Sequence, residues 1–205
     1  MRPTTHAVTA VGAGLLSCFM SCAAFAQAAA PSTDLRTPQS FDSITDKTAR
    51  SKAIFQEAGK VIMSPRCQNC HPNGDRPTQG NDMHLHQPMV VRGPADMGAT
   101  ALRCMTCHQG ANFAPAGVPG NPKWHLAPLS MAWQGKSLGQ ICAQIKDKKR
   151  NGDKTLAQIS EHMGHDDLVG WAWNPGANRT PAPGTQAQFG QLIEAWIASG
   201  AACPA

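Results

Sequence analysis

Aromatic side chains are scarce in this chain of 205 residues: they make up 5% of it, and tyrosine is absent. Charged residues account for 15%, and the formal net charge is +5. The sequence has no stripe of basic residues interleaved with aromatic ones, a pattern typical of nucleic-acid-binding proteins, so it predicts no nucleic-acid partner. The one basic run, residues 146–150, lies where a helix is expected to end. It is interpreted as a solvated helix terminus, or as a docking patch for an acidic partner protein.

Long apolar runs are also absent, except at the N-terminus. Arg2 precedes the mostly apolar residues 7–26, which end in the small-residue pattern Ala24-Phe25-Ala26. This pattern predicts a cleaved secretory signal and therefore a periplasmic location. Two alternatives stay open: the run is long enough to serve as an uncleaved signal-anchor, and the residues that end at Cys18 resemble a lipoprotein box.

Internal repeats of domain size and low-complexity tracts are lacking, which predicts a single domain. The expected division is a signal peptide at 1–26, a flexible leader at 27–40 and the domain at 41–205, with no membrane span after cleavage. Loss of Arg2, the one charged residue before residue 27, lowers the net charge from +5 to +4.

A pentapeptide of the form Cys-x-x-Cys-His occurs twice, at residues 67–71 and 104–108. Two thiols three positions apart can reach the two vinyl groups of one porphyrin, and the histidine that follows can ligate the iron. The sequence therefore predicts two covalently bound c-type haems. The predicted attachment residues are Cys67, Cys70, Cys104 and Cys107, and the predicted proximal iron ligands are His71 and His108.

The same cysteines have another interpretation. Two Cys-x-x-Cys pairs could close a four-cysteine zinc site, or each pair could form a redox disulfide. Neither use requires a histidine directly after both pairs, so the sequence favours haem.

Of the eight cysteines, six follow residue 26, and two of these, Cys142 and Cys203, lie outside the motifs. An even remainder in an oxidising compartment predicts a disulfide between them. The alternative is two separate buried thiols, because free cysteine is commonly buried.

The sequence predicts a mainly α fold: a compact, cytochrome c-like dihaem domain with long loops rich in Gly and Pro. Apolar residues at helical spacing and capping residues define the expected helices. The helices are expected at residues 46–63, 99–107, 137–148, 155–163 and 185–200, and an irregular loop is expected at 109–134.

The two motifs begin at residues 67 and 104, too close together for two complete cytochrome domains, so both haems are expected to share one fold. Each iron then needs a distal ligand or has an open site. We expect His86, in the loop between the motifs, to be one distal ligand. We expect His125, in the apolar segment Trp124-His125-Leu126, to be the other. The competing candidates are His84, His162, His165, Met83, Met89, Met97, Met131 and Met163.

Two further sets of polar side chains have candidate roles. His162 and His165 would form a metal-binding or proton-handling pair on one helix face, but Gly164 between them is expected to end the helix. One of the two could instead be a distal haem ligand. Guanidinium groups match the geometry of haem propionates. The candidate propionate partners are Arg76, Arg92 and Arg103.

Four stretches carry a resemblance to a known family. They are Met63-Ser64-Pro65-Arg66-Cys67 with Cys70-His71-Pro72, Trp124-His125-Leu126, Trp171-Ala172-Trp173-Asn174-Pro175-Gly176 and Trp196-Ile197-Ala198-Ser199-Gly200-Ala201. In these stretches the chain resembles small exported dihaem cytochromes labelled as subunits associated with isoquinoline-oxidoreductase-type molybdenum hydroxylases. The resemblance covers most of residues 60–205. It implies a redox protein partner, such as a dehydrogenase or a molybdenum hydroxylase, and no molybdenum in this chain.

These observations predict periplasmic electron transfer by a non-catalytic carrier or by the electron-transfer subunit of a dehydrogenase. The alternative is a small haem enzyme or gas sensor with one open iron site. Binding of carbon monoxide to the reduced protein separates the two.

Overall fold

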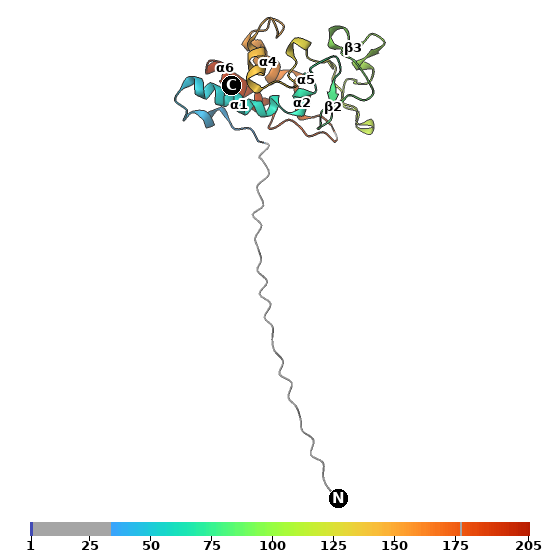
Figure 1. Ribbon diagram of the computed structural model, residues 1–205, viewed down its shortest axis with the longest axis horizontal. Coiled ribbons are helices and arrows are strands. Elements are labelled where there is room, and N and C mark those ends of the chain that lie inside the picture. The colour runs from blue at the N-terminus through green and yellow to red at the C-terminus, as the bar shows by residue number, and fades with distance from the viewer. Residues whose placement is uncertain (2–33, 177) are drawn as a thin grey trace. The chain divides into compact units, whose positions relative to one another are not determined.

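The computed structural model describes Met1, residues 34–176 and residues 178–205. The predicted signal peptide, the signal-anchor and the lipoprotein box therefore lie outside the described residues. From residue 34 onward the chain belongs to one unit. It is mainly helical with two small two-stranded sheets, which confirms the predicted helical class (Figure 1). No helix among the described residues is both long enough and apolar enough to cross a bilayer.

The two longest helices lie where their capping residues predict. Helix α1 (Lys47–Ile62) begins after Asp46, whose carboxylate accepts a hydrogen bond from the Ala49 amide. Helix α6 (Gln186–Ala198) begins after Thr185, which forms a capping box with Gln188. Each cap satisfies amides that the first helical turn leaves without partners. The sequence predictions for residues 46–63 and 185–200 are thus confirmed.

Helices α3 (Leu138–Lys146) and α4 (Leu156–His165) also begin with capping boxes, at Ser137 and Thr155. Their predicted positions are confirmed, with one difference. Gly164 does not end α4, which continues to His165.

The reason that Gly164 stays helical is its packing against Gly190 of α6. A Cβ added to either glycine would lie about 3 Å from the Cα of the other. The missing side chains therefore let α4 and α6 cross closely, and this tertiary contact overrides the tendency of glycine to end helices.

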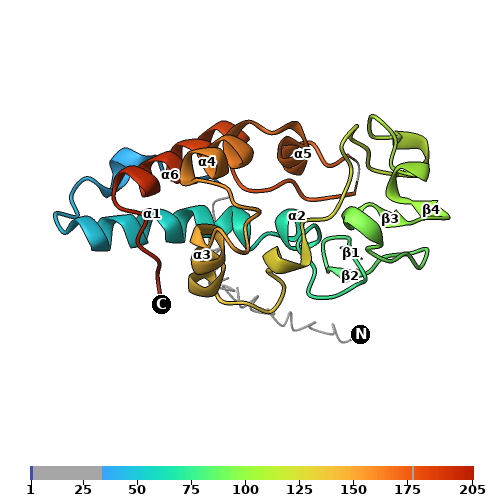
Figure 2. The same cartoon turned by 90° about the horizontal axis from the view of Figure 1, so that it is seen from above.

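The apolar core lies between α1, α3, α4 and α6, which gather at one end of the unit in Figure 2. At its centre the rings of Phe55 and Trp196 lie 4.7 Å apart, and Ile141 and Leu192 are fully buried beside them. Short helices connect the core to the rest of the chain. They are η1 (Pro38–Phe41), α2 (Pro65–Gln68), α5 (Asp167–Gly170) and η6 (Trp171–Trp173).

The start of the ordered unit differs from the predicted boundary at residue 41. Leu35 and Phe41 are buried in the core, and the amide of Arg36 donates to the Glu57 carboxylate of α1. Burial of these two apolar side chains fixes residues 34–40 on the fold, so the predicted leader at 27–40 is too long.

The other end of the unit consists of loops and two hairpins (Figure 2). Strand β1 (Thr78–Gln79) pairs antiparallel with β2 (His84–Leu85), and β3 (Gly98–Ala99) pairs with β4 (Leu102–Arg103). Single helical turns complete this part. They are η2 (Pro94–Asp96), η3 (Cys104–Thr106), η4 (Ala114–Ala116) and η5 (Leu129–Met131).

The predicted helix at 99–107 is therefore wrong. Gly98 has a φ of 90°, and a Cβ there would meet the backbone of residues 102–104, so the chain folds back as a hairpin. Only the turn at Cys104–Thr106 is helical. The predicted irregular loop at 109–134 is confirmed, apart from the single turns η4 and η5.

Cys142 and Cys203 form a disulfide, as the cysteine count predicts. It joins α3 to the C-terminal segment across 61 positions of sequence. Replacing both cysteines with alanine is expected to lower the free energy of unfolding by about 2–4 kcal/mol, because the bond restricts the unfolded chain. Urea unfolding followed by circular dichroism measures this. An unchanged midpoint would show that the core alone fixes the C-terminus.

Candidate functional site

The first Cys-x-x-Cys-His motif lies on α2 and the residues that follow. Ser64 precedes the helix and Pro65 occupies its first position, where the fixed φ of proline favours a helix start. The amide of His71 bonds to the Cys67 carbonyl, so the helical turn extends through the motif. Residues three and four positions apart on a helix share one side, which brings Cys67, Cys70 and His71 together. Burial raises the pKa of Cys67 to about 12 and that of Cys70 to about 11, so both thiols are neutral at neutral pH.

The His71 ring is held by two contacts from residues about 60 positions away. Its Nδ1 lies 2.7 Å from the Met131 carbonyl oxygen, and its ring stacks on Trp133 at 3.5 Å with an interplanar angle of 7°. A carbonyl only accepts hydrogen bonds, so Nδ1 carries the proton and Nε2 keeps a lone pair. Burial lowers the pKa of His71 to about 4, which keeps the imidazole neutral.

The second motif has the same surroundings although its backbone differs. It begins with the single turn η3, and the His108 amide bonds to the Cys104 carbonyl. His108 Nδ1 lies 2.8 Å from the Pro119 carbonyl oxygen, and the ring stacks on Trp124 at 4.5 Å and 11°. Burial lowers the pKa of His108. The two motif histidines thus share one tautomer, one kind of acceptor and one kind of stacking partner.

Each motif borders a pocket. The first pocket contains Cys67 and His71 and encloses about 1150 Å³, its open mouth included. Its apolar lining is Ala127, Pro128, Met131, Trp133, Ile145, Ile159, Met163, Leu168, Val169, Trp171, Ala172 and Phe189. The second pocket contains Cys104, Cys107 and His108 and encloses about 1000 Å³. Its apolar lining is Pro77, Pro88, Val90, Val91, Leu102, Pro119, Trp124, Leu126 and Trp171.

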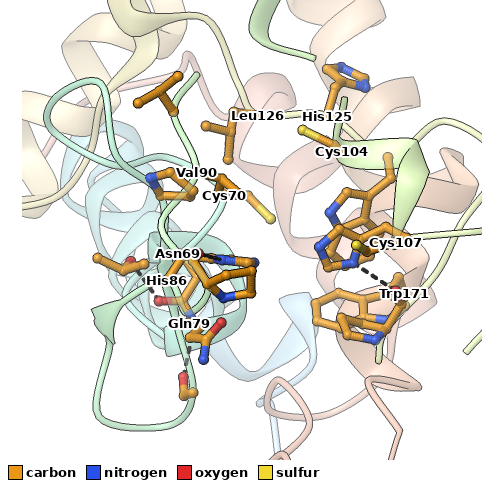
Figure 3. Close-up of a pocket in the computed structure, with 18 of the residues that line it drawn as sticks. Asn69, Cys70, Gln79, His86, Val90, Cys104, Cys107, His125, Leu126 and Trp171 are labelled. Atoms are coloured by element: carbon orange, nitrogen blue, oxygen red, sulfur yellow. Dashed lines mark hydrogen bonds between the residues drawn. The ribbon is translucent and has the colours of Figure 1, made fainter. Parts of the chain in front are cut away.

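The two pockets share part of their lining. Four residues border both: Arg66, Cys70, His125 and Trp171. Figure 3 shows Cys104 and Cys107 on one side of the second pocket, and Asn69 and Gln79 on the opposite side. Trp171 packs edge-on against Trp124 at 4.9 Å, so an aromatic side chain lies in the common lining and contacts the stacking partner of His108.

His86 approaches the second motif histidine. The His86 and His108 rings lie 5.8 Å apart at 68°, and both line the second pocket. His86 Nδ1 lies 2.9 Å from the Pro88 carbonyl oxygen, which leaves Nε2 as the acceptor. Metal–imidazole bonds of about 2.0–2.1 Å on either side of one ion would separate the ring centres by roughly 6 Å. The separation of the two rings matches this value.

His125 and His162 differ in how they meet the first pocket. His125 is exposed, borders both pockets and directs Nδ1 to the Lys123 carbonyl. His162, on α4, is half-buried and lines only the first pocket, with Nδ1 3.8 Å from Asp166 Oδ2. Repulsion from His162 contributes, after burial, to the lowered pKa of His71. His162 and His71 therefore share the first pocket.

The remaining histidine candidates have other surroundings. His84 is exposed and uses both ring nitrogens, one on Asp82 and one on Gln79. His165 is exposed at the end of α4. Among the residues that the structure describes, no three His, Cys, Asp or Glu side chains gather as a metal site.

The three arginines that the sequence suggests as propionate partners differ in their surroundings. Arg92 is buried, pairs with Asp96 at 2.6 Å and donates to the carbonyls of Pro72, Gly74 and Ala127, so its guanidinium holds loops together. Arg103 is exposed at the second pocket. Arg76 donates to the His86 carbonyl. Arg66, which directly precedes Cys67 and borders both pockets, was not among the arginines chosen from the sequence.

No family model matches the sequence, and neither a curated protein nor a solved structure matches it.

Proposed function

We propose that this protein is a dihaem c-type cytochrome with a cytochrome c-like fold that carries electrons. The observation that supports this most is the repeated setting of His71 and His108. Each ring donates Nδ1–H to a backbone carbonyl, stacks on a tryptophan and keeps an Nε2 lone pair in a largely apolar pocket. Proteins hold metal-ligating histidines in this way, because the second ring nitrogen fixes the tautomer and the orientation.

The residues present fit two haems. Cys67 and Cys70 would attach one in the first pocket, and Cys104 and Cys107 the other in the second. Haem iron, when bound, supplies reversible one-electron redox chemistry. The apolar side chains around each site exclude water, and the two stacked tryptophans prevent the proximal imidazoles from rotating. Because Trp171 and Cys70 border both pockets, the sites lie on either side of a common wall, which favours electron exchange between them.

The geometry favours a histidine pair at each site. His86, expected from the sequence to be a distal ligand of one haem, would be the distal partner of His108, because the two rings lie 5.8 Å apart in one pocket. For the first site we prefer His162 to His125, since His162 lines that pocket alone and is half-buried, whereas His125 is exposed. The assignment of His125 stays a prediction.

The location and partner follow from separate observations. The disulfide between Cys142 and Cys203 supports an oxidising compartment such as the periplasm. The resemblance to exported dihaem cytochromes suggests a dehydrogenase, including a molybdenum hydroxylase, as the electron donor. An enzyme or gas sensor is the second candidate, and it requires one iron without a distal ligand.

The proposal is tested by the haem content of protein made with a cytochrome maturation system. We expect two covalent haems per chain in a pyridine haemochrome assay, and low-spin optical spectra in both oxidation states. The variant Cys104→Ala/Cys107→Ala is expected to keep one haem and serves as the internal standard. Protein that shows no haem stain on a denaturing gel would refute the proposal. Zinc binding or disulfide formation would then be the preferred interpretation of the cysteines. Two haems with one high-spin component would favour the enzyme or sensor.

A further inference from the structure

Arg66 is a buried cation in the lining of both pockets. Only 2% of the residue is exposed. One terminal nitrogen donates to the Gly80 carbonyl at 2.8 Å and to Asn81 Oδ1 at 3.0 Å. The guanidinium also lies over Trp171, 5.9 Å from the ring centre. These contacts orient the planar group but do not neutralise its charge.

Two features of Arg66 call for a further partner. Its Nε is buried and has no hydrogen-bond partner among the described residues. None of the ion pairs formed by the described residues includes Arg66. Its charged neighbour Arg179 repels it and does not compensate its charge. A buried guanidinium without a carboxylate is costly, so a fold that retains one normally supplies an anion to it.

The position of Arg66 identifies the anion. The vinyl and propionate groups of a haem lie on opposite edges of the porphyrin. With the vinyl groups held at Cys104 and Cys107, the propionates would point to the opposite side of the second pocket, where Figure 3 shows Asn69 and Gln79. Arg66 belongs to that side, because Arg66 and Asn69 both donate to the Gly80 carbonyl.

We infer that Arg66 binds a propionate of the haem in the second pocket and, from its place between the two pockets, sets the reduction potentials of both haems. This inference rests on the proposed function. A cation next to a haem stabilises the reduced form, which carries one positive charge fewer. It also offsets the negative charge of the propionate. Because Arg66 directly precedes Cys67, its charge acts on the first haem as well.

Spectroelectrochemical titration of Arg66→Met tests the inference. The variant keeps a long apolar stem but removes the charge. We expect both midpoint potentials to fall. The larger shift should correspond to about a tenfold change in the equilibrium constant for reduction, or about 59 mV for a one-electron couple. Two matched controls accompany it. Arg103→Met removes an exposed charge at the same pocket and is expected to shift the potentials less, because water screens it. Asn81→Ala removes a hydrogen-bond partner of Arg66 without changing charge, and is expected to leave both potentials in place.

Arg66→Lys keeps the inference testable if Arg66→Met does not fold. Lysine keeps the charge and loses the fork of donors, so resonance Raman spectra should show a shifted propionate bending band with smaller changes of potential. Arg66→Met with two haems and unchanged potentials, or Arg66→Lys with an unchanged propionate band, would overturn the inference while the proposed function stands. Wild-type protein without covalent haem would refute the proposed function itself.

Discussion

Replacing His86 with alanine is expected to convert one of the two proposed haems to a high-spin form while both stay covalently attached. The His86 and His108 rings lie 5.8 Å apart at 68° and both line the second pocket, so removal of His86 would leave the iron held by His108 without a distal ligand. Half of the haem in the reduced variant should then bind carbon monoxide, whereas the wild-type protein should bind none. Optical spectra of the oxidised and reduced protein, with and without carbon monoxide, measure both effects.

The matched control for this variant is His84→Ala. His84 lies two positions earlier in the same hairpin, is exposed and bonds to Asp82 and Gln79, so its removal should leave both haems low-spin. If His86→Ala also keeps two low-spin haems and excludes carbon monoxide, His86 is not a ligand. A neighbouring side chain of the second pocket must then take that place.

The variant His162→Ala is expected to open the other haem in the same way, and His125→Ala is expected to leave both haems low-spin. His162, on α4, is half-buried and lines the first pocket alone. His125 is exposed and borders both pockets. The double variant His86→Ala/His162→Ala should contain no low-spin haem.

Three outcomes would contradict the assignment of His162. If His125→Ala gives the high-spin haem instead, the expectation drawn from the sequence is correct. If Met163→Leu gives it, the first haem is bound by a thioether, and its reduction potential should exceed that of a bis-histidine site. Met163 is the relevant competitor because it is buried in the same pocket. In a third outcome, neither His162→Ala nor the double variant His86→Ala/His162→Ala changes the spin state of a haem. That result would favour an enzyme or gas sensor, in which one iron already lacks a distal ligand. His165→Ala, on the same helix but exposed, is the control.

Features that depend on neighbouring residues could be predicted from the sequence. The five consecutive residues of each motif contain the groups that a c-type haem requires, so the candidate site could be located without a fold. The capping boxes at Ser137, Thr155 and Thr185 define helix starts because their hydrogen bonds close within one turn. The disulfide could be predicted because only two cysteines remained.

Features that depend on packing could not be predicted from the sequence. The predicted helix at 99–107 became a hairpin because Gly98 packs its backbone against residues 102–104, and Gly164 stayed helical because Gly190 lies against it. In both cases a contact that is distant in sequence or specific to the fold outweighed a weak local preference.

The sequence by itself determined that two Cys-x-x-Cys-His motifs share one mainly helical chain, and it predicted the disulfide that the structure shows. The tertiary structure alone decided which groups surround those motifs. The acceptors of His71 and His108 are backbone carbonyls, and these have no signature in the sequence because every residue has one. The approach of His162 to the first pocket and the burial of Arg66 between both pockets likewise depend on how α4, α2 and the hairpins pack. The residues of each motif determine which group can be bound. Packing between distant segments determines which other side chains lie near that group.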